Sequence, residues 1–154
     1  MVSNMSKIED NKRILREAYA RWSASKGGSV GDWMALADND ITFGSLAEGA
    51  EVMPFTAPIH GKEVLRSYFD GLLANWTMIH YTVDEYVAEG NSVVAIGSTA
   101  WTNKQTGKTV ETRKVDVWKF KNGKAVEFYE YYDTAKVAAA AAATSSPPTA
   151  GMVA

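Results

Sequence analysis

The stretch KVDVWKF, residues 114–120, places an acid in the middle of a segment that otherwise predicts a buried β-strand. Valine, tryptophan and phenylalanine favour strands, whereas aspartate is among the residues that strands accommodate least well. A buried carboxylate without a partner is also costly in free energy. Asp116 therefore lies either on a solvated face of the sheet or in a cavity where its charge has a use.

This stretch belongs to a β-rich second half that follows a helical first half. A Ser6–Glu9 capping box predicts a helix to about Ser23. Further elements are expected as a short helix over 33–37, a short strand over 40–45 and a helix over 62–73. Four strands, separated by turns rich in Gly and Asn, are then expected over about 78–88, 92–103, 109–120 and 125–133. Helices followed by an antiparallel meander predict an α+β fold.

Composition and charge are those of a single globular domain, with 154 residues, 46% apolar and 22% charged. A formal net charge of −2 without a basic cluster argues against nucleic acid as a partner. The absence of cysteine excludes disulfides and thiolate sites and fits a cytoplasmic location. No apolar run approaches the ~18 residues that a membrane helix needs, so no membrane partner is expected.

Motifs for cofactors and metals are missing from the sequence. His60 and His80 are far apart and have no ligating partner one helical turn away, so no metal site is expected. Neither a phosphate-binding glycine loop nor a nucleophile elbow is present. We therefore expect no cofactor, and the polar residues embedded in apolar strands become the main candidates for chemistry.

Three segments resemble a known family: ALADNDITF (35–43), PIHGKEVLRSYFDGL (58–72) and KVDVWKFKNGKAVEFYEYYDT (114–134). They are similar to the SnoaL-like, ketosteroid-isomerase-related proteins of the nuclear transport factor 2-like superfamily. The resemblance implies a cone-shaped, curved antiparallel β-sheet wrapped round N-terminal helices, a cystatin-like α+β roll with a pocket in its mouth. Its implied bounds are a flexible N-terminus (1–6), a SnoaL-like domain (7–136) and an Ala-rich, then Pro- and Ser-containing mobile tail (137–154).

The resemblance also implies site residues. Asp116 and Tyr19 fall where ketosteroid isomerase has its oxyanion-hole aspartate and tyrosine. The general base of that enzyme falls at Ser45, whose hydroxyl cannot shuttle a proton at neutral pH, so ketosteroid isomerisation itself is not expected. In the limonene epoxide hydrolase pattern, the arginine falls at Lys114 and the two acids at Asp116 and Glu130.

The hairpin loop decides whether Asp116 faces the pocket, and the sequence allows two registers. If Asn122-Gly123 is a two-residue type I′ turn, Lys121 pairs with Lys124 and Asp116 lies opposite Tyr129. The face that carries Asp116 can then simply be solvated. This register sorts polar and apolar side chains onto the two faces of the sheet more cleanly than the second register does.

The second register has a three-residue loop with a glycine bulge, so that Phe120 pairs with Lys124 and Asp116 lies opposite Phe128. We adopt this register because, in the family, the aspartate and the last-strand pocket residues share the concave face. That face then carries one cation, two acids and three aromatic rings: Lys114, Asp116, Trp118, Phe128, Glu130 and Tyr132.

The expected function is that of an acid/base enzyme of the isomerase, cyclase or epoxide-hydrolase type, acting on a small lipophilic oxygen-containing molecule. Asp116 and Glu130 would exchange protons, while Lys114 and Tyr19 would stabilise developing charge on oxygen. The apolar neighbours of Asp116 favour its neutral form. Ligand contacts are expected from Phe43, Ser45, Trp118, Phe128 and Tyr132.

Two other functions are compatible with the same fold. The pocket could hold a small lipophilic ligand without turnover, or the domain could serve mainly for dimerisation. Trp22, Trp33, Trp76 and Trp101 are assigned to the core. A homodimer is expected because the outer face of the sheet would carry uncovered side chains: Arg113, Val115, Val117 and Tyr129.

Overall fold

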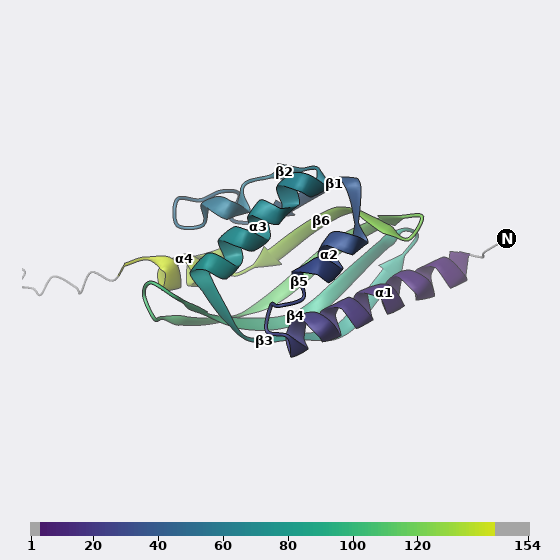
Figure 1. The fold of residues 1–154 in the computed structure, drawn as a ribbon. Helices are drawn as coiled ribbons and strands as arrows, with labels where there is room; N and C mark the ends of the chain where they lie inside the picture. The colour runs from purple at the N-terminus through teal and green to yellow at the C-terminus, as the bar shows by residue number, and fades with distance from the viewer. Residues whose placement is uncertain (1–3, 144–154) are drawn as a thin grey trace, which may run out of the picture.

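Three helices cover one face of a curved, six-stranded sheet (Figure 1), in a computed structural model that describes residues 4–143. The elements are α1 (Asn4–Ala24), α2 (Val30–Leu36), β1 (Ala37–Ser45), the 3-10 turn η1 (Pro54–Thr56), β2 (Ile59–His60), α3 (Lys62–Asn75), β3 (Trp76–Glu89), β4 (Ser92–Asn103), β5 (Thr109–Lys121), β6 (Lys124–Tyr132) and α4 (Thr134–Ala141). The α+β fold expected from the sequence is confirmed. Among the described residues, no helix has the length and apolar content needed to cross a membrane.

The strand order is β2-β1-β6-β5-β4-β3, and β3 to β6 form the expected antiparallel meander. The sheet is antiparallel, as expected, except at one pair, where β1 runs parallel to β6. Parallel neighbours require a long connection. Here that connection is α3 and the first three strands of the meander, which carry the chain to the far edge of the sheet and back.

The β5–β6 hairpin combines features of both registers that the sequence allows. Its turn has two residues, since Lys121 pairs with Lys124, and Asn122 and Gly123 have φ values of +51° and +79°, as a type I′ turn requires. The three-residue loop that we adopted is therefore wrong. A shift in pairing follows directly after the turn, and it changes the partners of all the residues beyond it.

The shift is a β-bulge at Val126: Phe120 pairs with Ala125, but Lys119 pairs with Glu127. Beyond the bulge Asp116 lies opposite Glu130, neither opposite Tyr129 nor opposite Phe128 as the two registers proposed. A bulge adds one residue to one strand only, so it moves the pairing by one position. The result keeps the two acids on the same face of the sheet.

Both ends of the domain differ from the expected bounds. α1 begins at Asn4, so residues 4–6 are helical and Ser6 lies in the first turn instead of capping the helix. At the other end, Asp133 caps α4 by accepting a hydrogen bond from the Lys136 backbone N–H at 3.0 Å. Val137 and Ala140 are buried, so residues 137–141 belong to the fold and not to a tail. Residues 1–3 and 144–154 lie outside the described residues.

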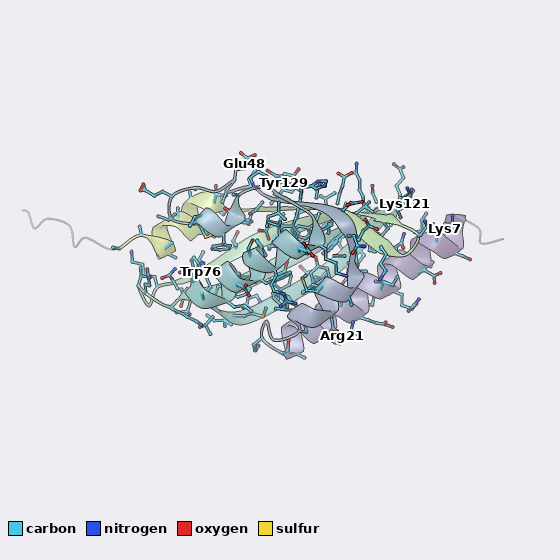
Figure 2. All side chains as sticks on the ribbon, turned by 45° about the horizontal axis from the view of Figure 1, so that its top comes forward. Lys7, Arg21, Glu48, Trp76, Lys121 and Tyr129 are labelled. Carbon is cyan, nitrogen blue, oxygen red and sulfur yellow. The ribbon has the colours of Figure 1, made fainter. Side chains whose placement is uncertain are left out.

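Aromatic side chains fill the space between the helices and the inner face of the sheet. Trp33 of α2 stacks on Trp118 of β5, with ring centroids 5.3 Å apart, and Phe43 of β1 stacks on Phe128 of β6 at 4.2 Å. Each such pair adds about 0.5–1.5 kcal/mol beyond the area that it buries. Charged side chains such as Lys7, Arg21 and Lys121 are exposed on the outside (Figure 2).

Candidate functional site

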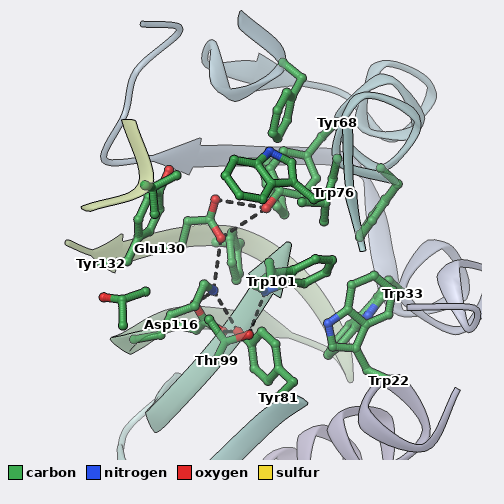
Figure 3. A pocket seen from close by; sticks show the side chains of 18 of the residues that line it. Trp22, Trp33, Tyr68, Trp76, Tyr81, Thr99, Trp101, Asp116, Glu130 and Tyr132 are labelled. Carbon is green, nitrogen blue, oxygen red and sulfur yellow. Dashed lines mark hydrogen bonds and ion pairs between the residues drawn. The ribbon is translucent and has the colours of Figure 1, made fainter. Parts of the chain in front are cut away.

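A cavity of about 90 Å³ lies between the inner face of the sheet and the helices (Figure 3). Thirteen of its 22 lining residues are aromatic, and three are charged: Lys114, Asp116 and Glu130. A few precisely placed polar groups in an aromatic wall are typical of a small-molecule site. We therefore treat this cavity as the candidate active site.

Strand alternation brings the charged residues together. Lys114 and Asp116 are two residues apart on β5, and Glu130 is paired with Asp116 from β6, so all three side chains project from one face of the sheet. The helices supply partners from above this face, Tyr19 from α1 and Tyr68 from α3.

The Lys114 ammonium group is at the centre of the cluster. Its Nζ contacts Asp116 Oδ1, lies 3.0 Å from Glu130 Oε1 and donates to the Tyr81 hydroxyl at 2.7 Å. An ammonium group has three N–H donors, and each has an acceptor here. Burial on its own lowers the pKa of Lys114, but the charges of Asp116 and Glu130 outweigh it, and the pKa lies well above its usual value. Lys114 is therefore charged at neutral pH.

Asp116 is held by donors on both oxygens. Its Oδ2 accepts hydrogen bonds from the Tyr19 and Tyr81 hydroxyls, both at 2.5 Å, while Oδ1 faces Lys114. Burial, and then the Asp116 charge, raise the pKa of Tyr19 and of Tyr81, so both phenols keep their protons. Three donors thus converge on the Asp116 carboxylate, and all three are suited to a charged acceptor.

Glu130 has fewer donors. The Tyr68 hydroxyl donates to its two carboxylate oxygens at 2.9 and 3.1 Å, and Lys114 is its other partner. Burial and the Glu130 charge raise the pKa of Tyr68. Glu130 therefore has two donor groups as partners, whereas Asp116 has three.

A hydroxyl pair lies beside the acids. Ser45 Oγ and the Tyr132 hydroxyl are 2.7 Å apart, and burial, with the charge of Glu130 adding to it, raises the pKa of Tyr132 to about 12. The two hydroxyls carry two protons and share one hydrogen bond. When Ser45 is the donor of that bond, the Tyr132 proton remains available to a ligand.

Of the nine residues that the sequence analysis assigns to the site, the structure places all but Ser45 in the cavity wall: Tyr19, Phe43, Lys114, Asp116, Trp118, Phe128, Glu130 and Tyr132. Ser45 is 2% exposed, is not part of the cavity wall, and shares a hydrogen bond with Tyr132, which is.

The sequence analysis missed Tyr68 and Tyr81, the partners that complete the cluster. The available signal was weak, because Tyr68 belongs to the apolar stripe of its helix and a tyrosine there is usually a core residue. The four tryptophans that it assigned to the core are buried core residues, and they also contribute to the cavity wall: Trp22, Trp33, Trp76 and Trp101. No group of three or more His, Cys, Asp or Glu side chains that could hold a metal ion occurs within residues 4–143.

The family model of the SnoaL-like domain matches residues 15–128. The chain belongs to the SnoaL-like family. The matched segment of this SnoaL-like protein includes Tyr19, Lys114 and Asp116 but ends two residues before Glu130. No curated protein matches the sequence at a significant level.

Solved structures with the same fold come from several bacteria. An NTF2-like protein of unknown function from Burkholderia pseudomallei is 20% identical, with a TM-score of 0.75 over 87% of this chain and 98% of that one. A protein from Mesorhizobium loti, named as a SnoaL-like polyketide cyclase, is 25% identical, with a TM-score of 0.65 over 80% and 97%. A protein of ketosteroid isomerase-like fold from Catenulispora acidiphila, solved with trimethylamine, is 16% identical, with a TM-score of 0.68 over 83% and 91%. Together these neighbours place the SnoaL-like protein in the NTF2-like fold.

Proposed function

We propose that this SnoaL-like protein is an acid/base enzyme of the isomerase, cyclase or epoxide-hydrolase type that acts on a small lipophilic oxygen-containing molecule. The observation that carries the proposal is the pair of buried carboxylates, Asp116 and Glu130, that share the ammonium group of Lys114 in an aromatic cavity. Ionisable groups gathered in this way mark functional sites more often than structural ones.

The two acids have different roles. Glu130 accepts the proton, because fewer donors stabilise its charge. Asp116 accepts from Lys114, Tyr19 and Tyr81 and holds these three groups in place. Tyr19 is thus a positioning residue, since its proton is directed at Asp116 and not at the cavity.

Proton transfer to Glu130 also frees a donor. The substrate releases a proton, and the electron pair of the broken C–H bond delocalises onto the substrate oxygen. Once Glu130 is neutral, its attraction for Lys114 weakens and one N–H of the ammonium group can turn to that oxygen. Return of the proton to a different atom completes an isomerisation, and Tyr132 is placed to donate a further hydrogen bond to the oxygen.

The size of the cavity limits the substrate. A cavity of about 150 Å³ holds benzene, and the cavity here measures about 90 Å³. In this conformation the pocket suits a molecule of a few heavy atoms, and a larger substrate requires α4 or the segment between β1 and α3 to move. Val137 of α4, with Met53 and Phe55 of that segment, contributes to the cavity wall.

Hydrogen–deuterium exchange tests the proposal. Small ketones such as acetone, butanone and cyclopentanone are incubated in D₂O with the protein, and loss of their α-protons is followed by proton NMR. A general base contributes about 10²–10⁴-fold, so Glu130→Gln should slow catalysed exchange at least about a hundredfold. Glu127→Gln, which removes an exposed acid from the same strand, should leave it unchanged. Equal exchange by the wild type and Glu130→Gln would contradict the role of Glu130.

A second candidate function is ligand binding without turnover. It is favoured by the complete set of partners around Lys114, which leaves no N–H free in the resting protein. Saturable binding of the same ketones without any exchange would support it over the enzyme.

A further inference from the structure

The cavity carries one more negative charge than positive charge. Its charged wall residues are Lys114, Asp116 and Glu130. Both carboxylates accept hydrogen bonds from tyrosine hydroxyls and contact the lysine, as charged acceptors do. The tyrosines stay protonated because burial raises their pKa. The net charge of the cluster is therefore −1.

No residue of the cavity wall balances this charge. Among the described residues, the wall contains no arginine, no histidine and no lysine other than Lys114. Arg16 is on α1, the helix that also carries Tyr19, but its guanidinium lies over the Tyr86 ring at 5.2 Å from the ring centroid, and neither Arg16 nor Tyr86 is part of the wall. An uncompensated charge in a low-dielectric cavity is costly, so a bound group that brings positive charge is favoured there.

The donors nearest the carboxylates are already engaged. The hydroxyls of Tyr19 and Tyr81 donate to Asp116, that of Tyr68 donates to Glu130, and all three N–H groups of Lys114 have acceptors. An anionic group entering this part of the cavity would meet two carboxylates, and of the phenols named above Tyr132 alone retains a proton to donate to it. A cationic group would meet acceptors that have unused lone pairs.

The wall also suits a cation through its aromatic rings. Lys114 Nζ itself lies 5.1 Å from the centroid of the Tyr81 ring and 5.7 Å from that of Phe128. A cation within about 6 Å of a ring centroid is attracted by the negative face of the ring, and aromatic cages bind alkylated ammonium groups in this way. With 13 aromatic residues around the cavity, a second cation has ring faces to contact.

We propose that the physiological ligand is a small organic cation, a protonated or quaternary amine, whose nitrogen lies beside Glu130 within the aromatic wall. This proposal concerns the same cavity and rests on the proposed function, to which it adds the class of substrate. When a cationic substrate passes a proton to Glu130, the substrate becomes neutral and so does the pocket. A neutral substrate would instead be left as an anion beside Asp116, which a low dielectric disfavours.

Isothermal titration calorimetry on the intact chain tests the proposal with two probes of matched shape. Trimethylammonium chloride carries a charge at neutral pH, whereas tert-butanol has the same branched outline and none. We expect trimethylammonium to bind the wild type about tenfold more tightly or better, as a desolvated cation–π site allows. Equal affinity for the two probes, or no binding of trimethylammonium at any soluble concentration, would overturn the proposal without need of a variant.

Two variants then test whether Glu130 supplies the negative charge that favours a cation. Glu130→Gln removes the excess negative charge at constant size, so its preference for trimethylammonium should fall about tenfold while its affinity for tert-butanol stays the same. Glu127→Gln removes one exposed charge from the same strand and should keep the wild-type preference. An undiminished preference in a folded Glu130→Gln protein would also overturn the proposal. Binding of trimethylammonium without hydrogen–deuterium exchange of the ketones would contradict only the proposed enzyme activity. Ketone exchange without a preference for trimethylammonium would contradict only the proposed class of ligand.

Discussion

At the scale of single residues, the cluster depends on phenols that stay protonated. Burial and the adjacent carboxylates raise the pKa of Tyr19, Tyr68 and Tyr81 well above that of a free tyrosine. Each phenol donates to an acid that would otherwise be buried with fewer partners. The protein therefore retains these protons in a pH range where an unfolded chain releases them.

This retention gives the stability a defined pH dependence. Above about pH 10 the unfolded chain loses its tyrosine protons while the folded chain keeps them, so the free energy of unfolding falls as the pH rises, and below that pH the stabilisation is fully present. Tyr68→Phe should flatten the fall by up to about 1.4 kcal/mol per pH unit. Urea unfolding followed by circular dichroism between about pH 8 and 11 measures the slope. Tyr131→Phe, which changes an exposed tyrosine, should keep the wild-type slope, and a Tyr68→Phe slope equal to it would contradict the prediction.

The residues of the cluster were not equally predictable. An acid in an apolar strand stands out, so Asp116 was found from the sequence, and the resemblance added Lys114 and Glu130. Tyr68 and Tyr81 could not be found in the same way. A tyrosine on an apolar stripe satisfies the periodicity wherever its hydroxyl points, and only the packing of helices on the sheet directs that hydroxyl at an acid.

At the scale of elements, the periodicity of apolar residues and the turn residues predicted the strands and helices, but they did not predict how the strands pair with one another. The Asn-Gly pair is typical of the two-residue turn that forms, but the resemblance led us to adopt the three-residue loop. The bulge at Val126 left no mark on the alternation of polar and apolar residues, because a bulge is set by how two strands twist against each other. The parallel pairing of β1 with β6 is likewise decided by tertiary packing, since it joins segments far apart in the sequence.

The cap of α4 offers a test at this scale. The Asp133 carboxylate accepts the Lys136 N–H and begins the helix that places Val137 in the cavity wall. Asp133→Ala should destabilise the protein by about 1 kcal/mol, a fall in Tm of about 2–4 °C, whereas Asp133→Asn retains the acceptor and should cost far less. Calorimetric melting compares the two variants, and equal melting temperatures would show that the cap does not stabilise α4.

At the scale of the whole molecule, the outer face of the sheet carries a patch made mostly of apolar side chains. Residues paired across β3, β4, β5 and β6 form rows of side chains on this face. The three helices α1, α2 and α3 cover the opposite face (Figure 1). Tyr131 and Val87 are 45% and 50% exposed. The rows consist of Val87, Val94, Val117 and Tyr129, and of Glu85, Ile96, Val115 and Tyr131.

We propose that this face is the interface of a homodimer, since exposed apolar faces of this kind commonly bind a second copy. Light scattering at micromolar concentration should give twice the chain mass of 16.8 kDa. Val117→Glu should shift the protein to the monomer, and Val64→Glu, on the exposed side of α3, should leave the dimer intact. A wild-type protein that scatters as a monomer would refute the interface.

The aromatic wall of the cavity makes intrinsic tryptophan fluorescence a direct readout of ligand binding. The chain contains five tryptophans, and all of them contribute to this wall: Trp22, Trp33, Trp76, Trp101 and Trp118. A ligand that enters the cavity thus changes the surroundings of every indole in the molecule, and a cation beside the rings shifts their emission by its field. Intrinsic fluorescence can therefore screen compounds against this one site without a label and without knowledge of the reaction.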